Sequence, residues 1–144
     1  MKIVLDMDNT LIDEFGQGRR PGAEAFLERL AADGHELALW TSSTKERALL
    51  ILRHLDLERH FAEFRFREDY DPDNRGLGKN INEIGGHVLI DDDPKQIAHM
   101  KKIRRRGILV PSYRTGGEEP EPGVFKRVYK ELNQKRGLLG LFRR

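Results

Sequence analysis

Two acidic pairs stand out because each directly follows an apolar run. Asp6 and Asp8 follow KIVL and lie two positions apart, and Asp91 and Asp92 follow HVLI. In an extended segment, side chains two positions apart point to the same side, so Asp6 and Asp8 repel each other unless a cation or proton lies between them. Mg²⁺ prefers hard oxygen ligands and keeps several waters. We therefore predict a magnesium site formed by Asp6, a backbone carbonyl near Asp8 and a carboxylate from Asp91 or Asp92.

Such a site predicts phosphoryl transfer. A carboxylate can attack phosphorus when a metal ion and nearby donors offset the repulsion between the two anions. In this scheme Asp6 is the nucleophile that forms an aspartyl-phosphate. Asp8 protonates the leaving oxygen and later deprotonates the attacking water. Thr41 donates a hydrogen bond to a phosphate oxygen, and Lys79 neutralises charge on the phosphoryl group.

The apolar pattern predicts the elements that position these residues. Short buried runs alternate with amphipathic segments, which indicates an α/β fold of one domain with a mostly parallel sheet and helices on both faces. The predicted strands are Lys2–Asp6, Glu36–Thr41, Phe64–Phe66, His87–Asp91 and Ile108–Val110. The polar residues above fall at the carboxyl ends of three strands, where open α/β sheets bind ligands.

Start and stop signals bound the predicted helices. Pro21 and Gly34 bracket the first, and Asp93 with Pro94 supplies the cap and first-turn proline of a helix that runs to about Arg105. A capping box from Ser43 to Glu46 opens a helix to about Leu55. A short helix is expected over 79–84, and a last amphipathic helix follows the loop Ser112–Gly123.

In this order the motifs resemble the haloacid dehalogenase (HAD) superfamily of phosphohydrolases. The residues that carry the resemblance are DMDNT at 6–10, Thr41 after ELALW, Lys79, and Asp91-Asp92 after HVLI. A further set is similar to the FCP/SCP-like (NIF-type) branch of that superfamily. This set comprises Arg20-Pro21-Gly22 with Phe26-Leu27, LWTS at 39–42, Arg67-Glu68, and IDDDP at 90–94.

The resemblance implies roles for particular residues. Asp6 is the nucleophile and Asp8 the acid and base, while Thr41, Ser42 and Lys79 contact the phosphate. Magnesium lies on Asp6, the Asp8 carbonyl and Asp92, with Asp91 beside it. The chain departs from the branch at Asn9-Thr10, where Glu-Thr is usual, and at Asp92, where a small residue or asparagine is usual.

The resemblance also bears on the substrate. The stretches from Asp8 to Pro21 and from Ser42 to Lys79 are too short for a cap domain. A capless site stays open, which in this superfamily goes with phosphoproteins or nucleic-acid ends. The segment that shapes the serine-peptide pocket in eukaryotic members is shortened, so their substrate is not carried over.

Other protein classes fit the motifs less well. A response-regulator receiver also uses strand-end acids, threonine and lysine, but there the lysine comes last, whereas Lys79 precedes Asp91 and Asp92. Dehalogenase chemistry is disfavoured because Asp8 supplies the acid that a phosphatase needs. A non-catalytic binding module on the same fold stays open as an alternative.

Composition excludes other chemistry. The 144 residues contain no cysteine, so disulfides, thiolate nucleophiles and sulfur-ligated zinc are excluded. The absence of a long apolar run predicts no membrane span and a cytoplasmic location.

Charge divides the chain unevenly. Residues 1–93 carry a net −8 and residues 94–144 a net +10, which favours a polyanionic partner such as nucleic acid only weakly. We expect a phosphatase core over 1–133 and a basic tail over 134–144. The oligomeric state is not readable from the sequence.

Overall fold

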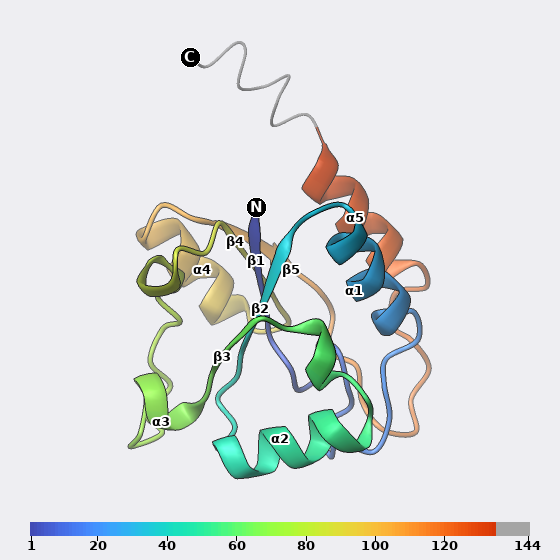
Figure 1. Ribbon diagram of the computed structural model, residues 1–144, viewed down its shortest axis with the longest axis horizontal. Helices are drawn as coiled ribbons and strands as arrows, with labels where there is room; N and C mark the ends of the chain where they lie inside the picture. Colours follow the sequence, from blue (N-terminus) through green and yellow to red (C-terminus); the bar gives the residue numbers. More distant parts are fainter. Residues whose placement is uncertain (135–144) are drawn as a thin grey trace.

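The computed structural model describes residues 1–134, which form a five-stranded parallel sheet with helices on both faces (Figure 1). The strand order is β3-β2-β1-β4-β5, so β1 lies at the centre. The elements in chain order are β1 (Lys2–Leu5), α1 (Ala23–Ala32), β2 (Glu36–Trp40), α2 (Lys45–His54), the 3-10 helix η1 (Glu58–His60), β3 (Glu63–Arg65), α3 (Arg67–Tyr70), the 3-10 helix η2 (Ile81–Ile84), β4 (Val88–Asp91), α4 (Pro94–Lys102), β5 (Arg106–Leu109) and α5 (Val124–Asn133). The predicted fold class is confirmed.

Two hydrophobic clusters cover the two faces of the sheet. Ile3 and Leu5 of β1 pack into the larger cluster, which includes buried residues of α1, α2 and α5. Val4, between them in the sequence, packs into the smaller cluster with Trp40 and with Met100 of α4. Successive side chains of a strand point to opposite faces, so both clusters bury β1. The strand that carries Asp6 is therefore held from both sides.

The structure confirms two helix signals and corrects a third. Asp93 caps α4, its side chain accepting from the N–H of Lys95, with Pro94 in the first turn. The predicted capping box at Ser43 is wrong: Thr44 is the cap of α2, and its side chain accepts from the N–H of Arg47. The helix begins one residue later because the N–H of Ser43 already donates to Thr41 Oγ1 at 3.0 Å.

Some predicted boundaries also shift. The helix expected to reach Arg105 ends at Lys102, because Arg104 adopts a left-handed conformation (φ 57°) that a helix cannot continue through. β5 begins at Arg106 rather than Ile108, since Arg106 and Gly107 pair with Val88 and Leu89 of β4. Long-range pairing, which the local pattern does not contain, sets this strand end.

The connections after β1 and β2 hold no separate cap domain within residues 1–134. The first contains only two isolated bridges, Asp8 with Ile12 and Ile12 with Arg19. The second contains α2, η1, β3 and α3; β3 is the edge strand of the sheet, and α2 lies crosswise below the strands in the view of Figure 1. No helix in residues 1–134 is long and apolar enough to span a membrane. The predicted basic tail lies outside the described residues from position 135 on.

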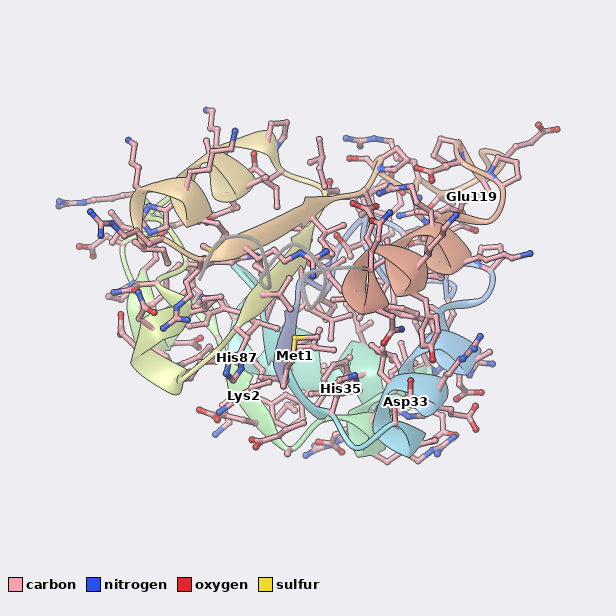
Figure 2. All side chains as sticks on the ribbon, turned by 90° about the horizontal axis from the view of Figure 1, so that it is seen from above. Met1, Lys2, Asp33, His35, His87 and Glu119 are labelled. Carbon is pink, nitrogen blue, oxygen red and sulfur yellow. The ribbon has the colours of Figure 1, made fainter. Side chains whose placement is uncertain are left out.

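The two ends of the sheet differ in chemistry. At the end where β1 begins, the Lys2 backbone N–H donates to His87 Nδ1 at 2.9 Å and the amino terminus lies 3.1 Å from His35 Nδ1. Figure 2 shows these residues together and Glu119 well away from them, beside α5. The opposite end, where the parallel strands finish, carries Asp6 and Asp91.

Candidate active site

Asp6 directly follows the central strand, and a tight turn closes over it. The Asp6 N–H donates to the carbonyl of Ile90 on β4 at 3.0 Å, and Leu11 N–H donates back to the carbonyl of Met7 at 2.9 Å. Asn9 takes a left-handed conformation (φ 66°) that asparagine tolerates better than most residues. The turn brings the hydroxyl of Thr10 to 2.8 Å from Asp6 Oδ2. The Asp6 side chain is thereby fixed at the strand end.

Lys79 forms a buried ion-paired triad with Asp6 and Asp91. Its Nζ lies 2.9 Å from Asp6 Oδ1 and 2.7 Å from Asp91 Oδ2. The backbone around it is fixed as well, because the Lys79 N–H donates to the side chain of Gln96 on α4 at 2.8 Å. Lys79 was expected to begin a short helix over 79–84; the helix η2 begins at Ile81 instead, and the Lys79 ammonium group lies between the carboxylates that follow β1 and end β4.

Burial dominates the electrostatics of this triad. It raises the pKa of Asp6 to about 6 and that of Asp91 to about 7, although Lys79 partly offsets the shift in both. For Lys79, burial lowers the pKa, but the attraction of the two carboxylates outweighs it and raises the pKa above its ordinary value. The buried triad contains two acids and one base, so it carries a net negative charge when both acids are ionised.

Asp92 completes a group of three carboxylates that can hold a metal ion. One oxygen each from Asp6, Asp91 and Asp92 lies within 4.8 Å of the others. The hydroxyl of Ser112 donates to Asp92 at 2.5 Å and orients it. Oxygen ligands of this kind suit Mg²⁺. The net negative charge of the triad and the donor set therefore both fit a divalent cation.

Asp8 makes no contact with the triad and pairs with Arg47 of α2. The Arg47 guanidinium donates to both carboxylate oxygens, at 2.9 and 3.0 Å. The same guanidinium also donates to Ser43 Oγ at 3.0 Å and to the Glu14 carbonyl at 3.2 Å. Asp8 thus has both oxygens occupied by one arginine.

A cavity of about 570 Å³ opens above these residues. Its walls include Asp6, Asp8, Lys79 and the exposed Ser42. Thr41 is buried beside Ser42 and is not a wall residue; its hydroxyl oxygen accepts from the Ser43 N–H. The structure therefore brings Asp6, Asp8, Ser42, Lys79, Asp91 and Asp92 to one cavity, with Thr41 immediately behind it.

A comparison with known protein families shows which family the chain belongs to. A family model described as NLI interacting factor-like phosphatase matches residues 1–135. The chain belongs to this family. It is a phosphatase of the HAD superfamily, a class that uses a metal ion and acts on phosphorylated substrates, and the resemblance seen in the sequence is confirmed.

Solved structures show that this phosphatase shares its fold with distant relatives. A Thermotoga maritima protein assigned as a beta-phosphoglucomutase has a TM-score of 0.69 at 17% identity, covering 91% of this chain and 99% of that one. The core domain of a Streptococcus pneumoniae TIGR4 protein assigned as a phosphoglycolate phosphatase has a TM-score of 0.58 at 17% identity, covering 90% and 94%. The comparison with curated proteins gives no match.

The sequence did not predict the contacts of two arginines at this site, although Arg20 is part of the motif that resembles the NIF-type branch. Arg20 is fully buried, pairs with Glu119 at 2.7 Å through two parallel bonds, and donates to the carbonyls of Asn9 and Thr10. It thereby fixes the turn after Asp6 from below. Arg47 occupies the third position after the helix cap Thr44, and no local pattern in the sequence indicated that it faces the site.

Proposed function

We propose that this phosphatase is a Mg²⁺-dependent phosphomonoesterase that works through an aspartyl-phosphate on Asp6 and accepts macromolecular substrates, either phosphoproteins or nucleic-acid ends. The observation that carries the proposal is the buried group of Asp6, Asp91 and Lys79 at the carboxyl ends of β1 and β4, with Asp92 within metal-binding distance.

Each residue has a distinct task in this mechanism. Thr10 and Lys79 hold the Asp6 carboxylate so that one oxygen can face the phosphorus. Lys79 also offsets negative charge as the aspartyl-phosphate forms and the ester bond breaks. Asp8 supplies the proton to the leaving oxygen, then removes a proton from the water that hydrolyses the intermediate. Ser42 and Thr41 donate hydrogen bonds to the phosphate oxygens.

Asp6, Asp92 and the Asp8 carbonyl would hold the Mg²⁺ ion, with Asp91 beside them. When bound, the ion supplies positive charge that offsets repulsion between the phosphate and the carboxylates. The open cavity supports the macromolecular substrate, since no cap domain within residues 1–134 covers it.

The test is hydrolysis of p-nitrophenyl phosphate with Mg²⁺ and with EDTA. We expect turnover that requires the metal and is lost in Asp6→Asn, which removes the nucleophilic charge with little change in shape. Asp56→Asn is the matched control, since the Asp56 side chain is 71% exposed and lies in a turn (φ 54°) that asparagine tolerates. Wild-type turnover unaffected by Asp6→Asn contradicts the mechanism, and no wild-type turnover favours a non-catalytic binding module.

The macromolecular preference has its own test. Electrostatic docking through the basic C-terminal third weakens with ionic strength, because salt screens exposed charges. We expect phosphocasein hydrolysis to fall more steeply with added NaCl than p-nitrophenyl phosphate hydrolysis. Equal salt sensitivity of the two reactions contradicts the docking idea.

A further inference from the structure

A second, smaller cavity of about 280 Å³ lies beside Asp8, and Lys79 is not among its wall residues. Its wall residues are Asp8, Ser42, Ser43, Thr44, Arg47 and Arg67. It therefore combines two guanidinium groups and three hydroxyl side chains with one carboxylate. The mechanism above uses Asp8 and Ser42 from this set and leaves both arginines without a task.

The two arginines differ in how they are held. Arg47 is bound to Asp8, Ser43 and the Glu14 carbonyl. Arg67 donates through Nε to the Ser42 carbonyl at 2.8 Å, and no carboxylate within residues 1–134 forms an ion pair with it. The charge of Arg67 acts on the Asp71 carboxylate without an ion-pair contact, and its guanidinium lines a cavity that shares Asp8 and Ser42 with the larger one.

The N-terminus of α2 contributes little to this cavity. The Lys45 N–H donates to Glu68 Oε1 at 3.0 Å, the Arg47 N–H to the Thr44 hydroxyl, and the Ala48 N–H to the Thr44 carbonyl. The attraction for an anion therefore comes from the arginine side chains.

The position of Asp8 decides which part of a substrate enters this cavity. Asp8 protonates the leaving oxygen in the proposed mechanism, so the group bonded to that oxygen must lie on the Asp8 side of the phosphate. Arginine forks bind phosphate through paired charge-assisted hydrogen bonds. We propose that Arg47 and Arg67 form a second anion site that selects phosphomonoesters whose leaving group carries another phosphate. This inference rests on the proposed function.

Occupation of this site also frees the catalytic acid. Because Arg47, Arg67 and Asp8 line the same cavity, a phosphate bound there would compete with Asp8 for the Arg47 guanidinium. Asp8 is then released to serve the leaving oxygen. The preferred substrate thereby removes an ion pair that holds the acid in the free enzyme.

The experiment compares matched substrates in the full chain. One pair is adenosine 5′-monophosphate and adenosine 3′,5′-bisphosphate; the other is one serine peptide carrying one or two phosphates. We expect kcat/KM to be about tenfold higher for the doubly phosphorylated member of at least one pair, as one added charge-assisted contact predicts. The pair with the larger ratio identifies the source of the second phosphate.

Variants assign that preference to the cavity. In Arg67→Gln we expect the ratio to fall to about 1, while Arg53→Gln keeps the wild-type ratio. Arg53 is a matched control, because it lies on α2, is 62% exposed and pairs with Glu58. Ratios near 1 in the wild type for both pairs, with p-nitrophenyl phosphate still hydrolysed, overturn this inference and leave the proposed function standing.

Binding settles the case in which the wild type shows no turnover. Isothermal titration then compares the two adenosine nucleotides directly. Tighter binding of the bisphosphate that disappears in Arg67→Gln supports the anion site even though the proposed function fails. Equal affinities in the wild type overturn the anion site as well.

Discussion

Replacement of Lys79 tests the electrostatic account of the site most directly. Lys79→Met removes the ammonium group between Asp6 and Asp91 and keeps much of the side-chain volume. Removal of one partner from a buried ion pair costs about 3–5 kcal/mol, because an uncompensated charge remains. We expect Lys79→Met to lower the free energy of unfolding by about 3–5 kcal/mol at pH 8 in EDTA.

The loss should depend on pH in a defined direction. Burial places the folded-state pKa of Asp6 at about 6 and that of Asp91 at about 7, above the ordinary value of 3.8. The native state thus binds more protons than the unfolded chain between about pH 4 and 7, and stability falls as pH rises through this window. At pH 5 both carboxyls are largely protonated, so we expect Lys79→Met to cost less than about 2 kcal/mol there.

Urea unfolding followed by fluorescence of Trp40, the single tryptophan, measures both values. Lys45→Met is the matched control, since Lys45 is exposed, and it should change stability by less than about 0.5 kcal/mol. An equal loss at pH 5 and pH 8 refutes the argument that ionised carboxylates cause it.

Three further predictions concern stability and metal binding. Arg20→Met should cost about 3–5 kcal/mol in urea unfolding, and adding Glu119→Leu should recover part of the loss; no recovery contradicts a paired-charge origin. Gly86→Ala would place a Cβ 2.7 Å from a methyl group of β1 and should cost about 1–3 kcal/mol, whereas Gly117→Ala, 3.4 Å from its nearest neighbour, should be neutral in the same assay. Mg²⁺ at about 100 times its dissociation constant should stabilise the EDTA-treated protein by about 2.7 kcal/mol in thermal unfolding; a stabilisation unchanged in Asp92→Asn argues against the proposed ligand set.

The local sequence pattern was sufficient to predict the site residues that lie at strand ends. Asp6 and Asp91 follow apolar runs, and adjacent parallel strands bring their carboxyl ends to one edge of the sheet. The pattern therefore predicted that these carboxylates meet. Lys79 was harder, because its glycine-rich surroundings are typical of exposed turns; only the chemistry of phosphoryl transfer and the order of the family's motifs pointed to it.

Contacts between residues far apart in the sequence could not be predicted from local sequence pattern. Arg47 reaches Asp8 across 39 positions, and Arg20 reaches Glu119 across 99. Charged side chains on amphipathic segments are usually solvated, so neither arginine carried a signal of burial or pairing. The cap of α2 was misplaced for a related reason, since the hydroxyl of Thr41 occupies the backbone N–H of Ser43.

The central place of β1 in the sheet has a consequence for synthesis of the protein. β1 is made first, yet one of its edges pairs with β4, which begins at Val88. A nascent chain that ends before Val88 can pair β1 with β2 and β2 with β3, but the other edge of β1 stays open, and open strand edges template aggregation. Asp6, the proposed nucleophile, lacks Asp91 for the same interval. Translation must therefore pass β4 before either the sheet edge is protected or the Asp6 and Asp91 carboxylates meet.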